Sequence, residues 1–326
     1  MLSHRLECLE LSPRRPGFPG TLVSNAVALV LVALLLLTNT VSAQRPARTT
    51  NASTRTITIT TEPNAIVWID EIRRGVTEAS GKLTVKNVSP ARHSLRVRAN
   101  GFKESTVAVL PGKSSATVKL VRTTNAAELA FQEAETAREQ GKDDEARQRA
   151  VEAYRRSLKL RPSFPAARVG LARVLLDLNE YKEALAEIGA ARRSRPIYPE
   201  ASAIEGRIHR EAAFDEEAIK SFRRSIREAR GFQPEAHVGL ARVLEEKGQF
   251  DEAIAEYRKA LDQLQDSEPV IYQLLGAAYE RQQKYKEALT AYEKYLTLAP
   301  NGSLAPAMRS IIDQLKRDAA GEQIIP

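Results

Sequence analysis

Residues 234–257 read PEAHVGLARVLEEKGQFDEAIAEY, and the same arrangement of small, apolar and charged residues returns along the C-terminal two-thirds of the chain. Small residues recur in two phases at intervals of 34, 35 and 35 residues. They are Ala172, Gly206, Ala241 and Gly276 in the first phase and Ala184, Ala218, Ala253 and Ala288 in the second. A bulky apolar or aromatic residue follows each member of the second phase by four positions, on the same helix face. A fixed period near 34 residues predicts an array of stacked helical hairpins.

This pattern resembles that of tetratricopeptide repeats. In that family, small residues let the first helix of a hairpin approach the second, and aromatic residues fill the space between successive hairpins. Four units are clear, and a more degenerate fifth at Asn125–Pro162 fits if its second helix gains one turn. The cores of the clear units are Leu171-Ala172, Gly206, Leu240-Ala241 and Leu275-Gly276, and second helices end at Pro162, Pro196 and Pro300.

We therefore expect an all-α solenoid of about five repeats over residues 125–300. One apolar stripe after it predicts a capping helix over residues 301–318, followed by a tail over 319–326. The stripe consists of Met308, Ile311, Ile312 and Leu315.

A different hydrophobic period precedes the repeats. Thr56–Thr60 and Ser94–Ala99 alternate with period two, and shorter apolar runs occupy Ala65–Ile69, Thr106–Leu110 and Ala116–Val121. Turn-forming residues separate these runs. This pattern predicts a small antiparallel β-sandwich over residues 55–122. The fold class is α+β, with two domains.

The β-domain resembles the PEGA domain, a β-sandwich module of prokaryotic extracytoplasmic proteins. Glu62-Pro63-Asn64-Ala65 stands where that family has its Pro-x-Gly-Ala turn, and Gly101-Phe102 resembles its Gly-aromatic corner. The sequence departs from the family pattern at Glu71 and at Ser89-Pro90-Ala91. Trp68, the only tryptophan, is expected to belong to the sandwich core.

The N-terminal residues 1–43 have the layout of an export segment. Residues 16–44 carry no charge, Ala26–Leu37 is a solid apolar block, and Arg14 and Arg15 precede it. Val41-Ser42-Ala43 fits cleavage by a signal peptidase, whereas Thr21–Thr40 is long enough for an uncleaved membrane anchor. Either reading places the remaining chain outside the cytoplasm, secreted, periplasmic or anchored in the inner membrane. Residues 44–54 read as a flexible linker.

Charge is uneven along the chain. Residues 44–124 carry 14 Lys and Arg against 5 Asp and Glu, whereas residues 125–326 carry 32 against 34. A basic module of this kind is attracted to anionic lipid or to an envelope polymer, although surface cations that serve only solubility explain it equally well. Nucleic acid is not expected as a partner, because the basic residues are not interleaved with aromatic ones.

The resemblance to tetratricopeptide repeats implies a groove, lined by the first helices, that binds a peptide or a partner subunit. The candidate groove residues are Arg173, Arg207, Arg242, Val169, Leu176 and Val238. The three arginines share one inward position in successive repeats and could grip an acidic segment. Alternatively, each arginine pairs with the carboxylate four residues later on its own helix, which is worth about 0.2–0.5 kcal/mol. Those carboxylates are Asp177, Glu211 and Glu246.

No sequence motif supplies catalytic chemistry. The chain has no phosphate-binding loop, no nucleophile elbow and no zinc-binding helix, and its one cysteine, Cys8, lies in the export segment. We expect no enzymatic activity, no cofactor and no metal. Two functions remain: a protein-binding scaffold, or an envelope-attachment module built on the basic β-domain. Because the hydrophobic periods on either side of Arg122–Asn125 share no obvious seam, the two domains are expected to fold separately.

Overall fold

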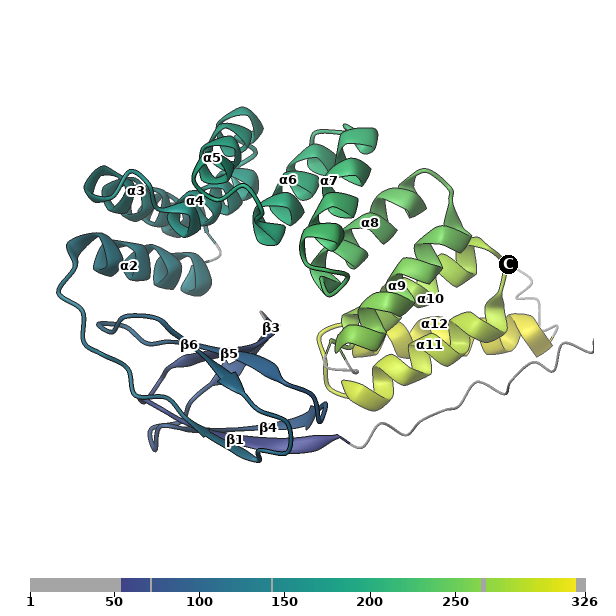
Figure 1. Ribbon diagram of the computed structural model, residues 1–326. Coiled ribbons are helices and arrows are strands. Elements are labelled where there is room, and N and C mark those ends of the chain that lie inside the picture. Colours follow the sequence, from purple (N-terminus) through teal and green to yellow (C-terminus); the bar gives the residue numbers. More distant parts are fainter. Residues whose placement is uncertain (1–53, 71, 142, 265–267, 321–326) are drawn as a thin grey trace, which may run out of the picture. The chain divides into compact units, whose positions relative to one another are not determined.

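The computed structural model describes residues 54–70, 72–141, 143–264 and 268–320, which form a β-domain followed by paired helices (Figure 1). The predicted export segment 1–43, nearly all of the linker 44–54 and residues 321–326 of the tail lie outside these residues. Among the helices that the structure describes, none has the length and apolarity needed to cross a membrane.

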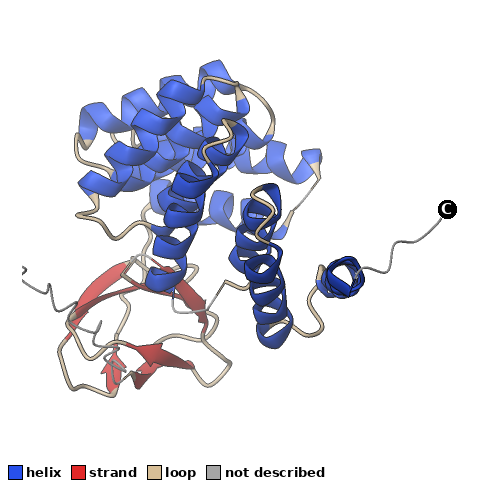
Figure 2. Cartoon of the chain, turned by 90° about the vertical axis from the view of Figure 1, so that its right-hand side faces the viewer, coloured by secondary structure: helices blue, strands red, loops and turns tan. Residues whose placement is uncertain are grey.

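Two sheets make up the β-domain (Figure 2). One has the strand order β4-β1-β7 and the other β3-β2-β5-β6. The strands are β1 (Arg55–Thr60), β2 (Ile66–Ile69), β3 (Ile72–Val76), β4 (Lys82–Val88), β5 (His93–Arg98), β6 (Ser105–Val109) and β7 (Ser115–Thr117).

The core of the β-domain lies between the sheets. Ile57 and Ile59 of β1 point into it, and Val67 of β2 and Leu95 of β5 come from the facing sheet; all four are fully buried. Residues two apart on a strand share a face, which is why the alternation in the sequence identified these strands.

The expectation of a fully antiparallel sandwich is wrong at one position, because β1 and β7 pair in parallel, with Thr58 opposite Ser115. Strands β3 and β4 were also not predicted. β3 is an edge strand with no buried residue, and its sequence, IRRGV, has no apolar alternation. An edge strand needs little apolar patterning, since only one side of it is paired and its faces are largely solvated.

The predicted turns have the backbone geometry that their residues suggest. Asn64, in the turn between β1 and β2, has φ = 56°, in the left-handed region that Asn tolerates. Gly81 has φ = +72°, and a Cβ there would lie 2.2 Å from the carbonyl oxygen of Thr61. Only glycine fits that position without displacing backbone.

The helices in the described part of the chain form five hairpins and a last single helix (Figure 1). The hairpins are α2 (Ala126–Gln140) with α3 (Asp144–Leu160), α4 (Pro165–Asp177) with α5 (Tyr181–Ser194), α6 (Pro199–Glu211) with α7 (Asp215–Glu228), α8 (Pro234–Glu246) with α9 (Phe250–Leu264), and α10 (Val270–Arg281) with α11 (Tyr285–Leu298). The last helix is α12 (Ala305–Ala320). α3 has 17 residues against 14 in α5, which is the extra turn anticipated for the degenerate first unit.

The small residues of the repeats lie against buried rings. Phe222 of α7 is fully buried between Gly206 of its own hairpin and Gly239 of the next. A Cβ at these glycines would approach the ring of Phe222 to 2.8 Å and 2.3 Å, respectively. One aromatic ring thus closes the contact within a hairpin and the contact to its successor. At the end of the array, α12 buries Met308, Ile312 and Leu315.

Candidate functional site

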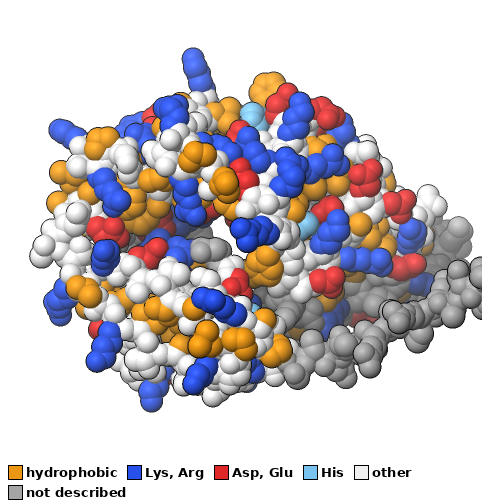
Figure 3. All heavy atoms as spheres, in the orientation of Figure 1, with side chains coloured by type: hydrophobic (Ala, Val, Ile, Leu, Met, Phe, Trp, Pro, Cys, Tyr) orange, Lys and Arg blue, Asp and Glu red, His pale blue; other side chains and the backbone are white. Residues whose placement is uncertain are grey.

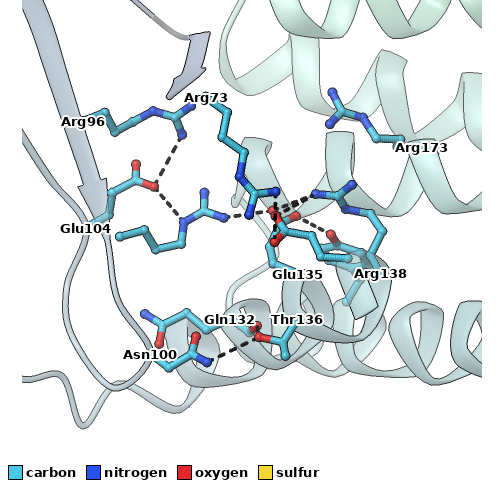
Figure 4. A network of polar contacts seen from close by, with 12 residues as sticks. Arg73, Arg96, Asn100, Glu104, Gln132, Glu135, Thr136, Arg138 and Arg173 are labelled. Atoms are coloured by element: carbon cyan, nitrogen blue, oxygen red, sulfur yellow. Dashed lines mark hydrogen bonds and ion pairs between the residues drawn. The ribbon is translucent and has the colours of Figure 1, made fainter. Parts of the chain in front are cut away.

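A polar seam that the sequence did not indicate joins the β-domain to the first helix of the array; it consists of Arg98, Glu104, Gln132 and Glu135, the last three of which are labelled in Figure 4. Arg98 of β5 donates from Nε to Glu104 and from a terminal nitrogen to Glu135 of α2, both at 2.9 Å. Its guanidinium also lies 5.1 Å from the ring of Trp68 and 4.9 Å from that of Phe131. Arg98 is 7% exposed, so these contacts are largely shielded from water.

Glu135 is the centre of the polar seam. Burial alone raises the pKa of a carboxyl, but here the cations Arg138 and Arg98 outweigh it and, with a hydrogen bond donated by the Tyr154 hydroxyl, lower the pKa of Glu135 to about 2. Arg98, whose pKa burial alone would lower, has a raised pKa because Glu135 and Glu104 lie beside it. Both groups therefore stay charged at neutral pH.

An amide completes the seam. Gln132 of α2 accepts a hydrogen bond from the backbone N–H of Gly101 at 2.8 Å and donates to the carbonyl of Phe102 at 2.7 Å. Gln132 is 3% exposed. Its side chain provides hydrogen-bond partners for backbone groups at the corner between β5 and β6 that no backbone group of the described residues provides. A seam of this kind cannot be predicted from the spacing of apolar residues, because the residues that form it are polar.

Trp68 belongs to this seam and not to the sandwich core. Its neighbours Val67 and Ile69 point into the core, so the intervening residue faces the other side of the sheet. There it lies opposite Arg96 on β5, whose guanidinium stacks 4.3 Å from the ring. Trp68 is nevertheless only 9% exposed.

A hollow of about 1520 Å³ adjoins the seam. Trp68, Arg96 and Thr106 of the four-stranded sheet line one side, and the first helices of the hairpins line the other. Eleven lysine and arginine residues border it against eight aspartate and glutamate residues. Figure 3 shows basic and acidic side chains interspersed around the opening.

The structure separates the six candidate groove residues into two groups. Arg173, Arg207, Arg242 and Val238 line the hollow. Val169 and Leu176 are 1% and 4% exposed and pack in the core of the first repeats, so their side chains do not face the hollow. Their helix, α4, is apolar on most of its circumference. The spacing of apolar residues in the sequence therefore did not distinguish the face that lines the hollow from the face that packs in the core.

The arginines do not pair along their own helices within the described part of the chain. Arg173 instead contacts Glu200 of the next hairpin at 3.0 Å. Arg207 lies 3.9 Å from Asp177 of the preceding hairpin and 3.7 Å from Glu235 of the following one. These ion pairs therefore connect neighbouring repeats.

A histidine in the β-domain has neighbours that the sequence did not suggest. His93 Nδ1 lies 2.5 Å from Asp70, and Nε2 lies 3.0 Å from the Ser89 hydroxyl, the spacing of a nucleophilic serine set. However, Nε2 is also 3.0 Å from the Ser89 carbonyl oxygen, which can only accept. The ring therefore bridges the turn that holds Asp70, after β2, and the turn that holds Ser89, after β4. Among the described residues, no group of acidic, histidine or cysteine side chains has the arrangement of a metal site.

Helical hairpins stacked by small residues against aromatic rings, with arginines on the inner helices, define a helical-repeat protein. The repeats are tetratricopeptide repeats: two family models of that description match residues 143–208 and 232–301, which confirms the prediction. No curated protein matches the sequence.

Two solved structures resemble part of the chain. The pilF protein of Pseudomonas aeruginosa is 16% identical, with a TM-score of 0.51 over 60% of this chain and 87% of that one. TTC0263, a tetratricopeptide-repeat protein of Thermus thermophilus, is 21% identical, with a TM-score of 0.49 over 59% and 99% of the two chains. At these identities the likeness to pilF supports the fold alone.

Proposed function

We propose that the chain is a non-enzymatic scaffold that works outside the cytoplasm and binds a protein or peptide segment in the hollow beside its inner helices. Tetratricopeptide repeats bind proteins and peptides, which supports the general class. The location is supported by the export layout of residues 1–43 and by the resemblance of residues 55–122 to the PEGA domain.

The observation that carries the proposal is the lining of the hollow. It combines exposed apolar side chains, such as Phe232 at 38% and Val270 at 43%, with charged ones on the adjoining helices. Apolar anchors among convergent polar groups are typical of surfaces that bind another chain. The basic side chains in excess favour a partner segment with acidic residues.

Photo-crosslinking in cells tests the binding surface. We expect benzoylphenylalanine in place of Phe232 to give a discrete protein adduct, because this ring lines the hollow. The matched control is Phe214, which is 56% exposed and does not line it. Identical adducts from the two positions, or none from position 232, would contradict the proposal.

The location has its own test. A reporter fused after Asn125 is expected to show the activity of an enzyme that folds only outside the cytoplasm, because the polarity of residues 1–43 directs export. The control fusion lacks residues 1–43 and should report the cytoplasm. A cytoplasmic signal from the full-length fusion would contradict the extracytoplasmic location and leave the binding surface to be judged by crosslinking.

An attachment role for the β-domain is the second candidate. Lys82, Lys86, Lys113 and Lys119 are exposed, whereas Arg55 and Arg98 are used inside the protein; Arg55, for example, donates to the Lys113 carbonyl at 2.8 Å. Replacing the four lysines with glutamine in the full chain would abolish retention on isolated envelopes if this role is correct. Unchanged retention would exclude it.

A further inference from the structure

The ion pairs between neighbouring inner helices follow a rule of spacing. Arg173 on α4 reaches Glu200, the second residue of α6, and Arg207 on α6 reaches Glu235, the second residue of α8. Each glutamate follows a proline that begins the helix, and the two glutamates are 35 residues apart. An arginine in one repeat is thus met by an acid at a fixed position of the next.

The rule fails at the third step. Arg242 on α8 corresponds to Arg173 and Arg207, but the residue 35 positions after Glu235 is Val270, which again follows a proline, Pro269. Valine cannot accept a hydrogen bond or balance a positive charge. At this step the arginine is present, but an exposed apolar side chain occupies the position at which the other two repeats have an acid.

Arg242 is consequently unpaired within the described part of the chain. Its side chain is exposed, and it makes no hydrogen bond or ion pair with any residue described there. Glu246, four residues further on, attracts Arg242 but lies within ion-pair distance of Arg210 instead, at 3.9 Å. Arg242 and Val270 both line the hollow.

We propose that Arg242 and Val270 form a docking point for a carboxylate on a protein partner, carried by an Asp or Glu that has an apolar residue beside it. The partner's carboxylate pairs with Arg242, as Glu200 and Glu235 pair with the arginines of the preceding repeats, and its apolar neighbour covers Val270. This inference rests on the proposed function and specifies the chemistry of the partner. The net basic border of the hollow attracts such a segment.

A defined peptide tests this docking point without knowledge of the natural partner. The probe is a fluorescein-labelled octapeptide of alternating Asp and Leu, and its control replaces each Asp with Asn. Fluorescence anisotropy on the full chain should show binding of the Asp peptide and at least tenfold weaker binding of the Asn peptide, because charge-assisted contacts are lost.

Three variants of the full chain sharpen the test. Arg242→Gln should weaken binding of the Asp peptide about tenfold or more. Arg223→Gln, which replaces an exposed arginine that does not line the hollow, should leave the affinity for the peptide unchanged. Val270→Glu should weaken binding of the Asp peptide as strongly, because the new glutamate is an acid of the protein itself that competes with the peptide for Arg242. The same substitution should leave the melting temperature unchanged or raise it, so that loss of binding cannot be attributed to unfolding. Val270→Gln, equal in size but uncharged, should weaken binding less than Val270→Glu.

The outcomes separate this inference from the proposed function. If crosslinks from position 232 appear but Arg242→Gln binds the Asp peptide like the unchanged protein, the docking point is refuted and the scaffold stands. If the Asn peptide binds as well as the Asp peptide, the docking point is refuted as well. Tenfold tighter binding after deletion of residues 321–326 would assign the site to the chain's own tail and overturn the external partner.

Discussion

Replacing Arg98 with methionine is expected to lower the free energy of unfolding of the β-domain by about 3–5 kcal/mol. Methionine retains much of the apolar stem but removes the cation that Glu135 and Glu104 share. Arg138 and Arg96 remain beside these carboxylates, yet removing one partner of a buried ion pair is costly. Trp68 is the only tryptophan and lies 5.1 Å from the guanidinium, so its fluorescence during guanidinium denaturation reports the change directly.

Arg92→Met is the matched control, since Arg92 is exposed on the same domain, and should change the free energy of unfolding by less than about 0.5 kcal/mol. A loss below about 1 kcal/mol for Arg98→Met would show that the seam contributes little.

The pH dependence of the free energy of unfolding tests the same seam. Because the pKa of Glu135 is lowered from 4.5 to about 2, its contribution to stability is complete above about pH 4.5 and is lost as the pH falls towards 2.

Gly239→Ala is expected to lower the free energy of unfolding by about 1–3 kcal/mol, although alanine ordinarily favours a helix. A Cβ at this position would lie 2.3 Å from Cε1 of Phe222, a ring that is fully buried and cannot move aside without disturbing Gly206. Overpacking of this kind outweighs the gain of about 1 kcal/mol in helix propensity. Thermal unfolding followed by circular dichroism at 222 nm measures the result.

Gly189→Ala tests the same substitution without the clash. Gly189 lies within α5, and a Cβ there would meet only a terminal nitrogen of Arg193, at 3.8 Å. The expected effect is a gain of up to about 1 kcal/mol. If both alanine variants were stabilised, the account of Phe222 as the element that joins two hairpins would be wrong.

The contrast between the repeats and the seam explains what could be predicted from the sequence. The hairpins were predictable because Ala172, Gly206 and Ala241 serve one packing requirement that returns every 34 or 35 residues. Strand β3 and the contacts of Gln132 were not, because neither buries a periodic apolar face. Their partners are distant in sequence, and polar contacts are decided by geometry that only the folded chain defines.

The inner arginines illustrate the same limit. Arg173 and Asp177 are four residues apart, and local spacing predicted that they would pair. The structure instead directs Arg173 to Glu200, 27 residues on, because stacking brings the start of the next inner helix to the guanidinium. Once that geometry is known, the sequence shows that the fifth hairpin departs from the pattern, because Val270 stands where the two preceding hairpins have an acid.

The contacts at the two ends of the array have a consequence for the apolar surface at each end. A stack of identical hairpins exposes an unfinished apolar surface at each end, onto which another molecule can add. Here α2 is held by Gln132 and Glu135 against the β-domain, and α12 buries Met308 and Leu315 over the last hairpin. Within the described residues, both ends of the array are therefore covered by other parts of the same chain, so the apolar surface that an isolated stack of hairpins would expose is used for contacts inside the molecule.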